Sequence, residues 1–180
     1  MSPSGTIDSK DEFLKTLGGL VVEWSHLEST VKDAISLCAS NHLGLNERLT
    51  AGEWFSSLLT LLNSLFRYRV FDEDALASFK KLHTELGTLS TRRNDLIHSE
   101  WRVWELEHGF LESDPPLLYV QRTQMKKRVN AGFGLQIETP NTKTLLDFIE
   151  ETKQMRLRLE ILVTSRAEEI KANREFEPPF

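Results

Sequence analysis

The stretch FKKLHTELGTLSTRRNDLIH, residues 79–98, decides how the fold is interpreted, because its apolar residues recur on one face of a helix. They are spaced three or four residues apart: Phe79, Leu82, Leu86 and Leu89. Successive helical residues advance by about 100°, so the same face should continue at position 93. The sequence has Arg93 there. A guanidinium on an apolar face is costly unless an anion or a partner subunit compensates it.

Two segments before this one have the same helical period. The first is predicted to begin near Ser9, and its apolar stripe is Phe13, Leu17, Leu20, Trp24, Leu27, Val31, Ala34 and Cys38. The second is predicted to run from Thr50 to about Tyr68, with Phe55, Leu58, Leu62 and Leu65 on one side. In each, a glutamate three residues after the initial Ser or Thr forms a capping-box pattern. The alternating spacing is typical of helices that pack nearly antiparallel in a bundle.

After residue 98 the period changes to that of strands. The segments 101–106, 117–121 and 135–139 are rich in strand-forming residues and are separated by turn-forming ones. Pro140 and Asn141 introduce a last long helix, whose apolar positions are Leu145, Ile149, Met155, Leu159, Leu162 and Ile170. The sequence therefore predicts an all-α fold of four helices, with a small antiparallel β insertion at about 101–139 between the third and fourth.

Length and composition predict a single domain, residues 9–174, between a disordered N-terminal tail (1–8) and a frayed C-terminal tail (175–180). No apolar stretch approaches the ~20 residues that span a bilayer, and the N-terminus lacks the pattern of a signal peptide. We therefore expect a cytoplasmic protein with no membrane partner. The net charge of −5 argues against a protein that coats nucleic acid, but it allows a local basic site.

Three polar side chains gather near the end of the third predicted helix. Asn94 and His98 are one turn apart and follow Arg93 directly. This Arg-polar-x-x-x-His pattern resembles the motif of the HEPN superfamily. The resemblance implies a four-helix up-and-down bundle with the motif late in the third helix. It also implies a homodimer in which two motifs form one composite active site.

The resemblance further implies a metal-independent endoribonuclease that needs no cofactor. The RNA 2′-hydroxyl would attack the adjacent phosphate and leave a 2′,3′-cyclic phosphate. His98 would act as general acid or base, Arg93 would hold the scissile phosphate, and Asn94 would orient either of them. A bacterial toxin, phage-defence or stress-response setting is implied, with an antitoxin or regulator as a possible partner. Glu100 stands where some such toxins carry a modified tyrosine, so that regulation is not expected.

Other residues are weaker candidates. Five basic residues could bind the RNA backbone: Arg92, Arg122, Lys126, Lys127 and Arg128. Taken alone, the basic residues of the predicted hairpin are better explained as keeping a strand edge soluble. Trp101 and Trp104 could stack on bases, although packing against the bundle is favoured. Cys38 and His42 are four residues apart, but two ligands make a weak metal site and we expect none.

Three alternatives stay open on the sequence. Arg93 could pair with a carboxylate such as Glu28 while His98 caps the helix end. The chain could be a non-catalytic HEPN-like interaction module, or it could be a nucleotide-sensing domain. The sequence has no phosphate-binding Gly-rich loop, no His-Glu-x-x-His and no nucleophile elbow. His26, His83 and His108 have no partner at a diagnostic spacing and are predicted to be surface or packing residues.

Overall fold

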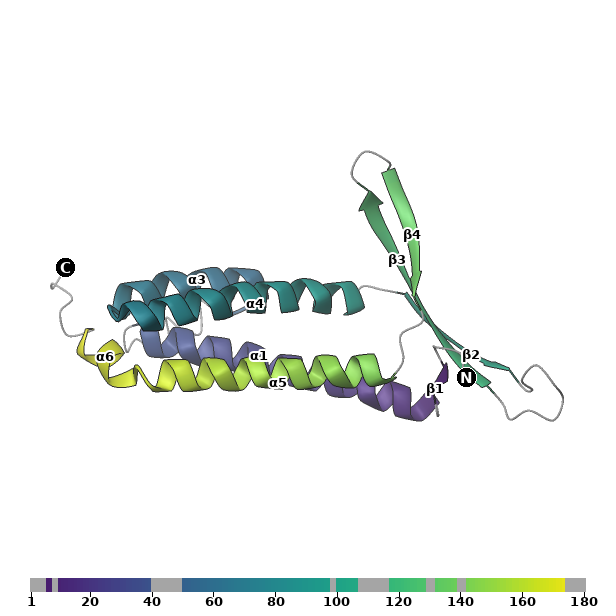
Figure 1. Ribbon diagram of the computed structural model, residues 1–180, viewed down its shortest axis with the longest axis horizontal. Helices are drawn as coiled ribbons and strands as arrows, with labels where there is room; N and C mark the ends of the chain where they lie inside the picture. The colour runs from purple at the N-terminus through teal and green to yellow at the C-terminus, as the bar shows by residue number, and fades with distance from the viewer. Residues whose placement is uncertain are drawn as a thin grey trace. The chain divides into compact units, whose positions relative to one another are not determined.

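The computed structural model describes residues 6–7, 10–39, 50–97, 100–106, 117–128, 132–138 and 142–173. The helices are α1 (Lys10–Cys38), α3 (Phe55–Arg69), α4 (Glu73–Ile97), α5 (Thr142–Thr164) and α6 (Ala167–Ala172) (Figure 1). The strands are β1 (Thr6–Ile7), β2 (Glu100–Leu106), β3 (Leu117–Arg128) and β4 (Gly132–Glu138).

The residues of the chain group into two compact units. One unit comprises Met1–Val22 and Arg92–Glu150, and the other comprises Glu23–Thr91 and Glu151–Phe180. Helices α1, α4 and α5 each contribute residues to both units. The second unit is a helical bundle, and the first contains the β-sheet.

Two pairs of aromatic side chains lie in the core of the bundle unit. The Phe66 and Phe79 rings stack with centroids 4.3 Å apart, and Trp24 lies 4.7 Å from Phe55. Aromatic pairs in these geometries add to the stability that comes from buried area alone. The first contact joins α3 to α4, and the second joins α1 to α3.

The directions of the helices contradict the expected up-and-down order. Trp24 contacts Phe55 near the start of α3, and the carbonyl of Cys38 accepts a hydrogen bond from Arg69 at its end. Contacts that advance together along both helices mean that α1 and α3 run parallel. The antiparallel pair is α3 and α4, which only residues 70–72 connect.

The sequence pattern predicted that the second helix begins at Thr50. This start is wrong, because α3 begins at Phe55. Gly52 before it has φ 72°, a left-handed conformation that interrupts a helix.

The predicted core is confirmed over most of its length. All four apolar residues that defined the third helix are at most 2% exposed. Five predicted core residues are only half-buried: Leu17, Leu65, Ile149, Met155 and Leu162. The helices bury neighbours instead: Ile35, Leu59, Phe66, Phe148 and Val163. The segment predicted as one last helix forms two helices, because α5 ends at Thr164 and α6 begins at Ala167.

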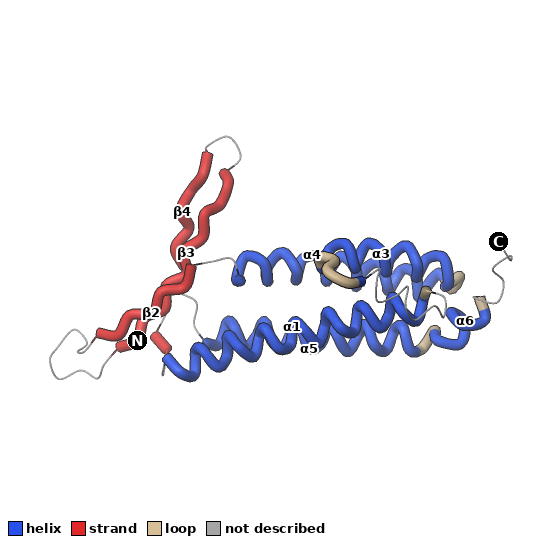
Figure 2. The backbone as a smooth tube through the Cα atoms, turned by 180° about the vertical axis from the view of Figure 1, so that it is seen from behind, coloured by secondary structure: helices blue, strands red, loops and turns tan. Residues whose placement is uncertain are grey.

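Strand β3 organises the sheet (Figure 2). Its first half pairs antiparallel with β2, Trp101 opposite Arg122 and Leu106 opposite Leu117. Its second half pairs antiparallel with β4, from Arg122 opposite Glu138 to Arg128 opposite Gly132. Thr6 and Ile7, within the predicted disordered tail, form β1 against Tyr119 and Leu118. The predicted tail 175–180 lies outside the described residues.

In the described ranges, none of the helices combines the length and the apolarity that a membrane span requires.

Candidate active site

The residues of the Arg-polar-x-x-x-His motif lie at the end of α4. Arg93 is half-buried and Asn94 is exposed. Arg93 Nη1 donates a hydrogen bond of 3.1 Å to Asn94 Oδ1. The Nε atom of Arg93 is buried. His98 follows the last residue of the helix and lies outside the described residues.

Arg93 is partly exposed, although the spacing of the apolar residues places it on the buried face of α4. The residue is half-buried, so the apolar stripe of α4 is only partly enclosed at this position. The buried face of the helix continues to Leu96, which is 7% exposed. A charged side chain there is less costly than the sequence pattern indicated.

A second arginine is anchored beside the motif. The guanidinium carbon of Arg92 lies 4.9 Å from the centroid of the Phe148 ring of α5, within the range of a cation–π contact. Phe148 is 2% exposed. Arg92, Asp95, Leu96, Thr144 and Phe148 line a cleft of about 170 Å³. Sequence periodicity did not identify this pairing, because it joins positions 56 residues apart.

The basic residues of β3 are described by backbone position. Arg122, Lys126 and Arg128 stand at alternate positions and so belong to one face of the strand, whereas Lys127 belongs to the other. The strand register places Arg122 opposite both Trp101 and Glu138. The predicted group of five RNA-binding residues is thus divided between α4 and two faces of β3.

The sequence also raised a metal pair of Cys38 with His42 and an ion pair of Arg93 with Glu28. Cys38 is buried, and His42 lies outside the described residues. In the part of the chain that the structure describes, no three His, Cys, Asp or Glu side chains gather as a metal site. Glu28, the proposed structural partner of Arg93, pairs with Lys32 at 3.0 Å instead.

Comparison with known proteins found no match among family models, curated protein sequences or solved structures. The resemblance to the HEPN superfamily therefore rests on the sequence pattern of residues 93–98.

Proposed function

We propose that this chain is an endoribonuclease of the HEPN type, with Arg93, Asn94 and His98 as its catalytic residues. The observation that carries the proposal is the hydrogen bond between Arg93 and Asn94 at the solvent-accessible end of α4. It holds the guanidinium by one nitrogen and so limits its rotation. An arginine positioned in this way supports the binding of a phosphodiester and of the charge that develops on it in the transition state.

His98 would supply the proton transfer. A histidine titrates near neutral pH, so it can accept the proton of the RNA 2′-hydroxyl or protonate the leaving 5′-oxygen. The 2′-oxygen forms a bond to phosphorus as the bond from phosphorus to the 5′-oxygen breaks. The products would be a 2′,3′-cyclic phosphate and a 5′-hydroxyl. A homodimer would place two motifs in one active site, and a cytoplasmic toxin or defence role would follow from the same resemblance.

The test is cleavage of 5′-labelled single-stranded RNA by the full chain in buffer containing EDTA. We expect cyclic-phosphate products, no cleavage of the same sequence as DNA, and a loss of at least about 100-fold in rate for His98→Ala. His26→Ala, a histidine 60% exposed on α1, is the matched control and should cleave normally. Loss of cleavage on chelation, cleavage of DNA, or full activity of H98A would contradict the proposal.

A further inference from the structure

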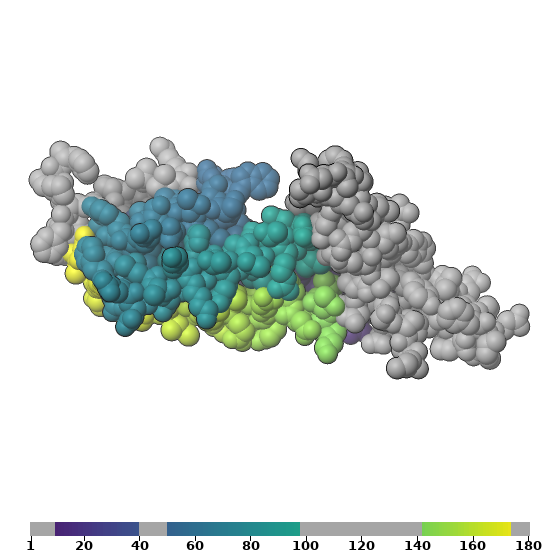
Figure 3. All heavy atoms as spheres, turned by 45° about the horizontal axis from the view of Figure 1, so that its top comes forward, coloured from purple at the N-terminus to yellow at the C-terminus, as the bar shows by residue number. Residues whose placement is uncertain are grey.

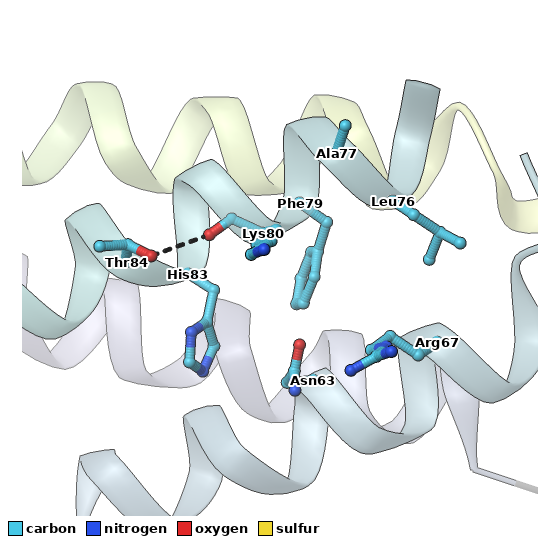
Figure 4. Close-up of a pocket in the computed structure, with 8 residues that line it drawn as sticks. All are labelled: Asn63, Arg67, Leu76, Ala77, Phe79, Lys80, His83 and Thr84. Atoms are coloured by element: carbon cyan, nitrogen blue, oxygen red, sulfur yellow. Dashed lines mark hydrogen bonds between the residues drawn. The ribbon is translucent and has the colours of Figure 1, made fainter. Parts of the chain in front are cut away.

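The groove between α3 and α4 contains a cleft that the candidate active site does not use (Figure 4). Its volume is about 430 Å³, within the usual range of small-ligand pockets. Asn63 and Arg67, one turn apart on α3, line one side. The other side is α4, with Leu76, Ala77, Phe79, Lys80, His83 and Thr84. The two helices lie side by side on the face seen in Figure 3.

The polar side chains of this cleft have unused hydrogen-bonding capacity. Within the described part of the chain, neither the Arg67 guanidinium nor the Lys80 ammonium makes an ion pair or a hydrogen bond. His83 Nε2 is buried and likewise has no hydrogen-bond partner there. A buried polar atom without a partner is unusual in folded proteins and points to a missing ligand or water. Thr84 differs, because its hydroxyl donates to the Lys80 carbonyl at 3.1 Å.

The charge in the cleft indicates what kind of ligand would complete it. Arg67 and Lys80 place two positive charges on one groove of a chain whose net charge is −5. No carboxylate is among the eight residues that line the groove. Phe79 is 2% exposed and closes the groove from inside, where the medium has a low dielectric constant. These features suit a phosphate group, which could bind the guanidinium by two oxygens.

Two exposed aromatic side chains adjoin the groove between α3 and α4. Arg67 also lines a second hollow of about 410 Å³, together with Tyr68, Phe71 and Asn173. Tyr68 and Phe71 are 62% and 69% exposed. The guanidinium of Arg69 lies 5.0 Å from the Tyr68 ring and supports one of its faces. Exposed aromatic rings beside a basic groove are a platform on which nucleobases stack.

Acidic groups near the second hollow are neutralised by an arginine. Glu169 accepts a hydrogen bond of 2.8 Å from the Phe71 backbone N–H. Arg166 lies 2.9 Å from an oxygen of Asp72 and 3.8 Å from one of Glu169. The second hollow therefore suits an uncharged base, whereas the groove between α3 and α4 suits the phosphate.

We propose that this surface binds a nucleotide, with its phosphate between Arg67, Lys80 and His83 and its base against Tyr68 and Phe71. The same chemistry is presented by a free mononucleotide and by one residue of a single-stranded RNA. The proposed catalytic residues are not part of this surface. H98A should therefore bind as the wild type does, so that a failure of cleavage and a failure of binding are separate results.

The test measures the affinity of the full chain for AMP, for inorganic phosphate and for a six-nucleotide RNA by titration calorimetry. We expect Arg67→Met and Lys80→Met each to weaken AMP binding at least about tenfold. Lys81→Met, the adjacent exposed lysine of α4 that does not line the cleft, should have no effect. Tyr68→Ala and Phe71→Ala should weaken AMP binding and leave phosphate binding unchanged.

Binding of AMP identifies a free nucleotide as a sufficient ligand, whereas binding of the RNA alone identifies a strand. Either result supports the site if R67M and K80M weaken the binding. A second readout does not depend on variants, since AMP or RNA should shift the imidazole NMR signals of His83 and leave those of His26 unchanged. The proposal is overturned if neither ligand binds at millimolar concentration, if R67M and K80M bind as the wild type does, or if the His83 signals do not move.

Discussion

Arg69 Nε donates a hydrogen bond of 3.1 Å to the carbonyl oxygen of Cys38, and this contact joins the ends of two helices that run in the same direction. Arg69 Nη1 also donates a hydrogen bond of 2.9 Å to the carbonyl oxygen of Asn173. The side-chain amide of Asn173 in turn donates a hydrogen bond of 2.7 Å to the carbonyl oxygen of Arg69. Arg69 is 3% exposed. A cation at the carboxyl end of a helix stabilises the unpaired carbonyls there.

We expect Arg69→Met to lower the free energy of unfolding by about 2–3 kcal/mol, because it removes charged hydrogen bonds to buried carbonyls. Urea denaturation followed by circular dichroism measures the change. The neighbouring exposed Arg67→Met should change stability by less than about 0.5 kcal/mol. Equal effects of the two substitutions would show that Arg69 does not connect α1 with α3.

A polar network crosses the bundle between α1 and α5. Arg156 Nε donates a hydrogen bond of 3.0 Å to Glu23 Oε1, and Arg156 Nη1 donates one of 2.9 Å to Glu160 Oε1. The hydrogen bond to Glu23 is the main cause that raises the pKa of Arg156. Thr30 also donates to Glu160, at 3.3 Å. This network therefore fixes the position of α5 against α1.

Glu23→Ala should cost about 2–3 kcal/mol of stability, since it leaves the half-buried Arg156 without one of its two carboxylate partners. A double-mutant cycle with Arg156→Ala should give a coupling of about 1–2 kcal/mol. Glu28→Ala breaks an i,i+4 pair with Lys32 on the same helix and should cost less than about 0.5 kcal/mol. A coupling near zero would contradict the structural role of the network.

Asp72 makes the stability of α4 dependent on pH. Its Oδ1 accepts a hydrogen bond of 2.8 Å from the Ala75 N–H, which is the geometry of an N-cap. This hydrogen bond is the main cause that lowers the pKa of Asp72 below its usual 3.8. A carboxyl whose pKa is lower in the folded state stabilises the fold above its unfolded pKa, and the contribution disappears as the pH falls through the folded pKa.

We therefore expect Asp72→Ala to lower the melting temperature at pH 6, and the difference from the wild type to shrink as the pH falls below about 3.8. Melting curves between pH 6 and pH 2.5 measure it. Asp72→Asn is the matched variant, because it keeps the capping oxygen without a titrating group and should show a smaller pH dependence. A difference that is constant over this range would contradict the capping role.

The hydrogen bond between Arg93 and Asn94 predicts graded effects on RNA cleavage. Asn94→Ala should reduce the rate about tenfold, because it frees the guanidinium without removing it. Arg93→Lys should reduce it further, since an ammonium keeps the charge but cannot bind a phosphate by two parallel hydrogen bonds. Single-turnover cleavage of labelled RNA measures both. A lysine variant that is faster than N94A would contradict the proposed role of the planar guanidinium.

Periodicity alone predicted α4 well because its apolar face packs along most of its length. The burial of Leu82, Leu86 and Leu89 follows from local pattern. The same reasoning overestimated the burial of Arg93. Periodicity gives the angle of a residue around the helix, but it does not show which other segments cover that angle.

The cleft between α3 and α4 shows a different limit. The pairs Asn63 with Arg67 and Lys80 with His83 are visible in the sequence as neighbours on a helix face. His83 nevertheless had no partner at a diagnostic spacing, because its neighbours in the cleft come from another helix. Residues that are 16 positions apart, such as Arg67 and His83, line one site only because α3 and α4 pack antiparallel.

The sequence by itself determined the helical segments, most of the core positions and the motif at the end of α4, since these depend on interactions within a few residues. Only the tertiary structure decided the directions of α1 and α3, the exposure of Arg93 and the presence of Arg67 and His83 in one cleft. They depend on which segments pack together in the folded chain, and interactions within a single helix do not encode that.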